Sequence, residues 1–182
     1  FGGSSLADTQ CFVRVSKIIL DCYYKDPTLR HAIVVSALGG VTDLLIDIAS
    51  NCNASNLYES KQYQAINQRI STLVKNLLEE SAAKEFLESF SNDIDSISKL
   101  LAEDLIYEDN ADQVIAGFGE LWSAKILSLY IAKLIDNDKE VEFIDSRKVI
   151  YLKTTDLGDV VDWNKSNDCL KKVIVANQAN IF

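Results

Sequence analysis

Six of the seven glycines fall in three close pairs, and each pair lies beside polar side chains that could meet a ligand. The pairs are Gly2-Gly3, Gly39-Gly40, and Gly117 with Gly119. Glycine lets backbone N–H groups approach phosphate oxygens closely, and the N-terminus of a following helix adds positive potential. Spacing alone leaves two interpretations open: a site for a small anionic ligand, or ordinary turns and close packing.

The polar neighbours of these glycines are hydroxyl groups and one carboxylate. Ser4-Ser5 follow the first pair, Ser36 and Thr42 flank the second, and Glu120 follows the third. The third pair begins a helical pattern, where each glycine costs about 1 kcal/mol relative to alanine. One interpretation is that these glycines allow another element to pack closely and that Glu120 is a surface residue. The other is that they leave room for a small ligand and that Glu120 points toward it.

The sequence lacks the residues that histidine-based catalysis and common metal sites require. His31 is the only histidine, so no histidine-based triad or metal site is expected, and it is interpreted as a surface or strand-edge residue. The four cysteines form no CxxC pair and show no metal-ligand spacing. Cys11 and Cys22 are predicted to share one helix, too far apart for a disulfide. Reduced thiols in a cytoplasmic protein are therefore expected.

The composition and the net charge limit the classes of protein to which the chain can belong. The 182 residues are 48% apolar and 25% charged, which is typical of a globular domain. The formal net charge of -9 disfavours nucleic acid and anionic membrane surfaces as partners. No run of about 18 apolar residues is present, so no membrane span is expected.

Alternating helix and strand patterns predict the elements around the glycines. Asp8 is expected to cap a helix that Pro27 and Thr28 end, and Ala32–Leu38 (AIVVSAL) is typical of a strand buried on both faces. Thr42-Asp43 are expected to cap the next helix. A second strand is predicted over 141–145 and a helix over 166–178, which leads into the apolar run 179–182. This order indicates a parallel sheet with helices on its faces.

Residues 55–108 contain no glycine or proline and carry two apolar stripes with a break near Ser81. They predict two long amphipathic helices packed as a hairpin, a candidate contact surface between subunits. Their acidic outer faces are interpreted as solvated, Asp93 included.

Four motifs together carry a resemblance to the aspartokinases of the amino acid kinase family. FGGSSLAD resembles the opening motif of that family, in which a lysine directly precedes the phenylalanine. VVSALGGVTDLL resembles the second motif, and GFGELWSAKILSLYIAKL followed by FIDSRK resembles the third and fourth. All four occur in the family's order. SSLAD and GELWSAK most resemble the methionine-pathway form of the bifunctional aspartokinase/homoserine dehydrogenases.

The resemblance implies the amino acid kinase fold, a three-layer α/β/α sandwich around a mainly parallel sheet. Residues 1–182 would form the amino-terminal part of the catalytic domain, with 55–108 as a helical insertion. The implied reaction transfers the γ-phosphoryl group of ATP, bound with Mg²⁺, to the β-carboxylate of L-aspartate in amino-acid biosynthesis. NAD(P) would be used only by a protein that also carries the dehydrogenase domain, and a cytoplasmic homo-oligomer is expected.

The resemblance also assigns residues. Gly2, Gly3 and Ser4 match the phosphate-binding loop, and Thr42 and Glu120 match the positions that bind aspartate. Neighbouring candidates are Ser5, Ser36, Gly39, Gly40 and Gly119. No metal ligand is assigned. The carboxylate of aspartate is already ionised at neutral pH, so the reaction needs no histidine base.

Two departures from the family pattern affect these expectations. The motif lysine would precede Phe1, and the family's nucleotide-binding half would follow Phe182, so the piece alone is expected to be inactive. Two alternatives remain open. One is another amino acid kinase, acting on glutamate, N-acetylglutamate, carbamate or UMP. The other is a non-catalytic regulatory module that keeps the fold.

Overall fold

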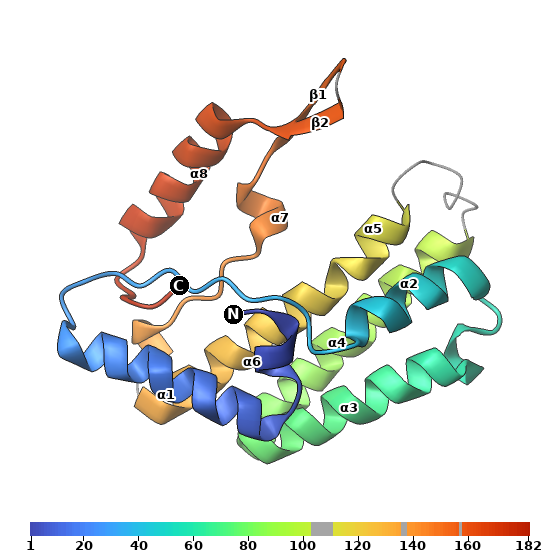
Figure 1. Ribbon diagram of the computed structural model, residues 1–182, viewed down its shortest axis with the longest axis horizontal. Coiled ribbons are helices and arrows are strands. Elements are labelled where there is room, and N and C mark those ends of the chain that lie inside the picture. Colours follow the sequence, from blue (N-terminus) through green and yellow to red (C-terminus); the bar gives the residue numbers. More distant parts are fainter. Residues whose placement is uncertain (103–110, 136–137, 157) are drawn as a thin grey trace.

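The computed structural model describes residues 1–102, 111–135, 138–156 and 158–182 (Figure 1). The end of the expected hairpin, 103–108, lies outside the described residues. The α-helices are α1 (Thr9–Lys25), α2 (Val41–Asn51), α3 (Lys61–Leu77), α4 (Glu80–Ala102), α5 (Ala111–Ala116), α6 (Phe118–Ile135), α7 (Ser146–Val149) and α8 (Trp163–Ala176). The shorter elements are the 3₁₀ turns η1 (Gly3–Leu6), η2 (Leu57–Glu59) and η4 (Asp138–Glu140), and the strands β1 (Leu152–Thr155) and β2 (Gly158–Val161).

Extended segments from distant parts of the chain lie side by side in the middle of the molecule. Residues 31–36 bond on one side to Phe1, whose nitrogen donates to the Val34 carbonyl at 2.7 Å. On the other side they bond to 180–182, for example from the Ile33 N–H to the Phe182 carbonyl at 2.7 Å. Residues 140–142 lie beyond 180–182. The bridges from Ile181 to His31 and to Val141 are parallel, as the sequence predicts.

These segments are less regular than the predicted strands. Within the described residues, only β1 and β2 form a continuous ladder, and that two-stranded sheet is antiparallel. In place of the expected strands 32–38 and 141–145, the structure has isolated bridges at His31 and Val141, because each segment pairs with its neighbour over two or three residues.

The prediction that 32–38 is buried on both faces is wrong. Ile33 and Val35 pack against the core, whereas Val34 is 80% exposed. Successive side chains of an extended segment point to opposite faces, so one face of this segment is covered and the other is open.

Helices lie on both sides of the extended segments. Figure 1 shows α1 and α6 on one side, with α3 and α4 beyond them, and α8 on the opposite side. This arrangement is the expected α/β/α order of layers.

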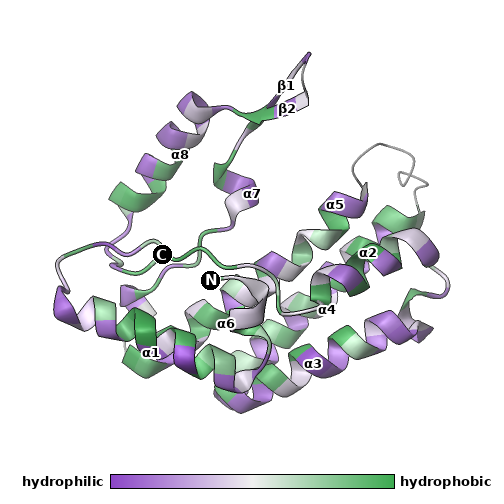
Figure 2. Cartoon of the chain, viewed as in Figure 1, coloured by the Kyte–Doolittle hydropathy of each residue, from purple (hydrophilic) through white to green (hydrophobic). Residues whose placement is uncertain are grey.

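The helical hairpin is confirmed as α3 followed by α4. The buried stripe of α3 comprises Ile66, Ile70, Leu73, Val74 and Leu77. Polar and apolar residues alternate along both helices in Figure 2, which is the amphipathic pattern that the sequence predicts. The break falls at Leu78 and Glu79, slightly before the expected Ser81.

Two predicted helix starts have different outcomes. Asp8 caps α1 as expected, because its Oδ1 accepts a hydrogen bond from the Cys11 N–H at 2.8 Å. Thr42 and Asp43 do not cap α2. Gly40 takes that position with a φ of 77°, a conformation that side chains disfavour, and Thr42 and Asp43 lie in the first helical turn.

The predicted positions of Cys11, Cys22 and His31 agree with the structure. All four cysteines are free, and Cys11 and Cys22 share α1. His31 lies at the edge of the 31–36 segment, half-buried, with its ring 6.2 Å from that of Tyr23.

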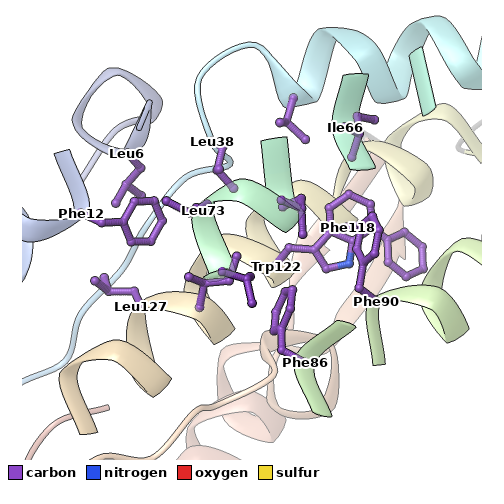
Figure 3. Close-up of a cluster of buried hydrophobic side chains, with 14 of the residues drawn as sticks. Leu6, Phe12, Leu38, Ile66, Leu73, Phe86, Phe90, Phe118, Trp122 and Leu127 are labelled. Carbon is purple, nitrogen blue, oxygen red and sulfur yellow. The ribbon is translucent and has the colours of Figure 1, made fainter. Parts of the chain in front are cut away.

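Trp122 on α6 joins the hairpin to the core. Its side chain is 1% exposed, and its ring centroid lies 4.7 Å from that of Phe90 and 6.0 Å from that of Phe118. Figure 3 shows this aromatic group continuing into the aliphatic side chains around Leu73 and Phe86. Tilted and edge-on rings at these distances add stability beyond the burial of their area.

Helices α5 and α6 form the most apolar stretch that is long enough to compare with a membrane span within the described residues. Asp112–Ile135 contains a window of mean hydropathy 1.3, long and apolar enough by composition to cross a membrane. This stretch is not the uninterrupted apolar run that the sequence prediction considers, because Glu120, Lys125 and Lys133 lie within it. The window is 44% buried, and Trp122, Ile126 and Ile131 lie in the core, so packing within the protein accounts for its composition.

The core face of α1 can be tested with two adjacent isoleucines. Ile19 is 2% exposed and Ile18 is 52% exposed. We predict that Ile19→Ala lowers the free energy of unfolding by about 2–5 kcal/mol, because it leaves a cavity in the core. The matched Ile18→Ala should change it by less than about 0.5 kcal/mol. Urea denaturation measures both, and equal losses would contradict the assigned orientation of α1.

Candidate functional site at the glycine turns

The first two glycine pairs pack against each other backbone to backbone. A Cβ added to Gly3 would lie 3.1 Å from the Ala37 carbonyl oxygen and 3.8 Å from the Gly39 Cα. A Cβ added to Gly39 would lie 3.3 Å from the Gly3 carbonyl oxygen. Gly3 and Gly39, which are 36 positions apart in the sequence, thus meet where only glycine fits comfortably.

The third pair contributes Gly119 to the same place. A Cβ added there would lie 2.8 Å from the Ala37 Cβ and 3.4 Å from Val41 Cγ1, which is too close for a side chain. On the same face of α6, the Ser123 hydroxyl donates to the Ser36 carbonyl at 2.6 Å. One glycine of each pair, namely Gly3, Gly39 and Gly119, therefore lies at residues 36–41. Close packing explains Gly3, Gly39 and Gly119 by itself, so their spacing alone does not require a ligand.

The opening loop still offers unused donors. The Ser36 N–H donates to the Phe1 carbonyl at 3.0 Å and the Ser5 N–H to the Gly2 carbonyl at 2.9 Å, so the segment is ordered rather than frayed. The N–H groups of Gly2, Gly3 and Ser4 bond to no described residue. Nothing lies within 4 Å of a Cβ added to Gly2. Consecutive free N–H groups are the arrangement that holds phosphate oxygens.

Thr42 directly follows Val41, and Glu120 directly follows Gly119. Because Val41 and Gly119 are in contact, the structure brings the elements that carry Thr42 and Glu120 together. Both residues are half-buried. Within the described part of the chain, neither the Thr42 hydroxyl nor the Glu120 carboxylate bonds to another protein group. Both groups are thus available to a ligand, and their roles stay predictions.

The sequence analysis missed one cation at this place. Arg69 of α3 donates from its Nη1 to the Gly39 carbonyl at 2.8 Å, beside the positive-φ Gly40. It places positive charge at the second glycine turn, which suits an anionic ligand. No local signal identifies Arg69, because it belongs to the hairpin and is 29 residues beyond Gly40.

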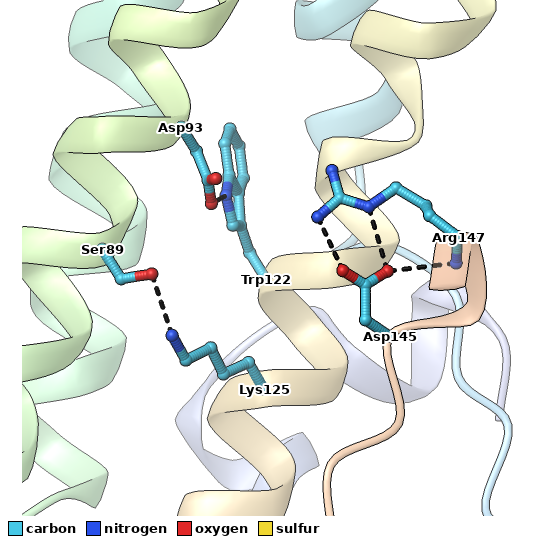
Figure 4. Close-up of polar contacts among 6 residues, drawn as sticks. All are labelled: Ser89, Asp93, Trp122, Lys125, Asp145 and Arg147. Carbon is cyan, nitrogen blue, oxygen red and sulfur yellow. Dashed lines mark hydrogen bonds and ion pairs between the residues drawn. The ribbon is translucent and has the colours of Figure 1, made fainter. Parts of the chain in front are cut away.

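A cavity of about 490 Å³ lies elsewhere, between α4, α6 and residues 142–149. None of the predicted site residues line it. In Figure 4, Asp93 and Ser89 of α4 face Trp122 and Lys125 of α6, and Asp145 faces Arg147. The Trp122 indole donates to Asp93 at 2.9 Å, so the interpretation of Asp93 as a solvated surface residue is wrong.

Asp145 and Arg147 form a two-pronged ion pair in this wall. Arg147 Nε and Nη2 donate to the two Asp145 oxygens at 2.9 and 2.8 Å. These hydrogen bonds hold the pKa of Asp145 below its usual value and raise the pKa of Arg147. The pair also lies near the aromatic core, with the guanidinium 5.4 Å from the Phe118 ring centroid.

Comparison with known proteins identifies the family. Residues 1–177 match the model of the amino acid kinase family, and the chain belongs to that family. It is 26% identical over its full length to the bifunctional aspartokinase/homoserine dehydrogenase 2 of Arabidopsis thaliana chloroplasts, covering 20% of that protein. It is 29% identical over 82% of its length to the bifunctional aspartokinase/homoserine dehydrogenase 2 of Escherichia coli, covering 17%.

A solved structure shows the same fold. Escherichia coli aspartokinase III in complex with aspartate and ADP superposes on the whole chain with a TM-score of 0.76 at 22% identity, and the chain covers 38% of it. The expected amino acid kinase fold is therefore confirmed. The chain spans about a fifth of the length of its curated relatives.

The contact between Gly119 and Ala37 yields a stability prediction. Gly119→Ala should lower the free energy of unfolding by about 1–3 kcal/mol, because the new methyl group overlaps the Ala37 Cβ. Gly117→Ala is the matched control, since its added Cβ meets nothing closer than 3.5 Å. Urea denaturation compares them.

A double-mutant cycle tests the specific partner. Ala37→Gly removes the overlapping methyl group, so it should restore part of the stability lost in Gly119→Ala. Equal effects of Gly119→Ala and Gly117→Ala, with no coupling to Ala37, would contradict the close approach.

The Asp145–Arg147 pair yields a prediction on pH. A lowered pKa means that the folded state favours the charged carboxylate, so the pair stabilises the fold above the ordinary aspartate pKa of about 3.9. The stabilisation is lost as the pH falls through the lowered value. Asp145→Asn should therefore cost stability at pH 7 but little in strong acid, and Arg147→Gln should show the same pH dependence. A loss that is independent of pH would contradict the charge-based role.

Proposed function

We propose that this chain supplies the phosphate loop and the aspartate-binding groups of an aspartate kinase. The meeting of Gly3, Gly39 and Gly119 around Ala37 carries the proposal, because it gathers the predicted ligand-binding elements at one place. The bifunctional aspartokinase names of the relatives support the choice of aspartate. In this proposal, residues 1–182 belong to the amino-terminal part of the catalytic domain.

In the proposed reaction, an oxygen of the aspartate β-carboxylate attacks the γ-phosphorus of ATP. The bond from that phosphorus to the bridging oxygen breaks, and the products are aspartyl phosphate and ADP. The nucleophile is already ionised at neutral pH, so catalysis consists of positioning and of stabilising charge on the phosphate oxygens. A chain whose single histidine lies at the edge of the 31–36 segment suits such a reaction.

The chain's own groups have separate tasks in this reaction. The free N–H groups of Gly2, Gly3 and Ser4 would hold phosphate oxygens, and Arg69 would add positive charge beside Gly40. The Glu120 carboxylate would bind the ammonium group of aspartate, and the Thr42 hydroxyl would donate to a carboxylate. Positioning of this kind can contribute several kcal/mol to lowering the barrier.

The described residues suit the phosphates of the nucleotide but do not include a cluster of metal ligands. Backbone donors at the glycine turns suit the phosphates of ATP. Among the described residues, no three histidine, cysteine or carboxylate side chains are grouped to hold a metal ion, so no step is assigned to Mg²⁺. NAD(P) would belong to a dehydrogenase region.

We also propose that the protein is a homo-oligomer and cytoplasmic. The hairpin supports the first, because a groove of about 680 Å³ on its surface is lined by apolar Leu78, Ala83 and Leu87 among charged residues. The four free cysteines support a reducing compartment.

The complete proposed enzyme allows a direct test with Glu120→Gln. This change removes the charge that binds the aspartate ammonium group, so the KM for aspartate should rise about 10- to 100-fold. The KM for ATP should change less than about twofold, because Glu120 is not assigned to the nucleotide. The exposed Glu85 of α4 supplies the control Glu85→Gln, which should leave both values unchanged.

The same assay separates the alternatives. ATP-dependent acyl phosphate is trapped as its hydroxamate, with L-aspartate and L-glutamate compared as acceptors. Faster turnover of glutamate would point to another amino acid kinase. Absence of product with any acceptor would favour a non-catalytic module.

A further inference from the structure

The cavity between α4, α6 and residues 142–149 has the size and lining of a small-molecule site. Its volume of about 490 Å³ falls in the usual range of roughly 300–1,000 Å³ for such sites. Its wall contains three acidic and three basic side chains: Asp93, Glu142, Asp145, Lys125, Arg147 and Lys148. Opposite charges in equal number suit a ligand that carries both signs.

Lys125 offers a cation that is not yet neutralised. Its ammonium group donates to the Ser89 hydroxyl at 2.8 Å and lies 5.9 Å from the Phe86 ring centroid. No carboxylate of the described residues lies within ion-pair distance of it. An ammonium group has three donors, so Lys125 can bind a ligand carboxylate and keep Ser89.

Asp93 offers the complementary anion one helical turn away. It follows Ser89 by four residues on α4, which is about 6 Å along the helix axis. One of its oxygens accepts from the neutral Trp122 indole, which leaves its negative charge uncompensated by that bond. The Arg147 guanidinium attracts Asp93 electrostatically, but its hydrogen bonds from two nitrogens go to Asp145. Asp93 can therefore accept from a ligand ammonium group, and Glu142 lines the same cavity.

The rest of the wall is apolar. It contains Leu121, Phe143, Ile144, Val149 and Val173. A ligand with an apolar side chain would remove this surface from water as well as satisfy the charges, which stabilises binding by about 25 cal/mol per Å² buried.

We propose that this cavity binds an α-amino acid with an apolar side chain, its carboxylate on Lys125 and Ser89 and its ammonium group on Asp93. Ser89 and Asp93 lie four residues apart on one face of α4 and line the same cavity with Lys125, so one ligand with its two charges on adjacent carbons can reach these groups. This assignment is independent of the proposed kinase activity, because it uses a different face of α6 from Glu120.

The binding test uses L-leucine and the 182-residue chain. Trp163→Phe leaves Trp122 as the single tryptophan, and Trp163 is 66% exposed, so the change should not disturb the core. Trp122 bonds to Asp93, so ligand binding should alter its fluorescence saturably. Isothermal titration follows the same binding directly. Isocaproate lacks the ammonium group and isoamylamine lacks the carboxylate, and each should bind at least about tenfold more weakly than L-leucine.

Charge-removing variants locate the site. Lys125→Met and Asp93→Asn should each weaken L-leucine binding at least about tenfold. Asparagine still accepts from the Trp122 indole, so Asp93→Asn removes the charge and keeps that bond. Lys17→Met and Asp21→Asn on the exposed face of α1 are matched controls and should bind like the parent chain. Circular dichroism verifies that each variant is folded.

Three results would overturn the proposal. The first is neither heat nor a fluorescence change with L-leucine up to about 10 mM, beyond the millimolar range of weak specific ligands. The second is equal affinity for isocaproate, which would remove the role of Asp93. The third is unchanged affinity in both folded cavity variants, which would place the ligand elsewhere.

Discussion

The space around Ala37 allows three segments to approach within van der Waals contact. Gly3 meets the Ala37 carbonyl oxygen, Gly119 meets its methyl group, and the Ser123 hydroxyl bonds to the preceding carbonyl at 2.6 Å. A methyl group on either glycine would separate the loop or the helix from the turn. The placement of the opening loop, of α2 and of α6 thus depends on two missing side chains, and the predicted ligand-binding groups are carried by these elements.

The parts of the fold that the sequence predicts well are those in which a local pattern decides the structure. Asp8 caps α1 because its carboxylate needs only the N–H three residues on, and the stripes of α3 and α4 recur at helical spacing. The extended segments were harder to predict. Residues 31–36 pair with 180–182 across about 150 positions, and Val34 is exposed because the covering of each face depends on other segments.

The candidate site shows the same division between local and distant information. Glycine pairs beside hydroxyl groups are visible in the sequence, and the structure brings Gly3, Gly39 and Gly119 together. Arg69 and Asp93 were not predictable as site residues, since each reaches its partner only through the packing of the hairpin. On an amphipathic helix an acidic residue of the outer face normally stays in water, and only the position of the Trp122 indole makes Asp93 an exception.

Helix α6 connects these features because it presents a different partner on each of its sides. Residues four apart on a helix share a face. Gly119 and Ser123 face the 36–37 turn, Leu121 and Lys125 face the cavity, and Trp122 lies against Phe90 of the hairpin. With three sides occupied, α6 can shift only by disturbing all of these contacts together. The apolar composition of α6 is therefore a consequence of its place at the centre of the packing.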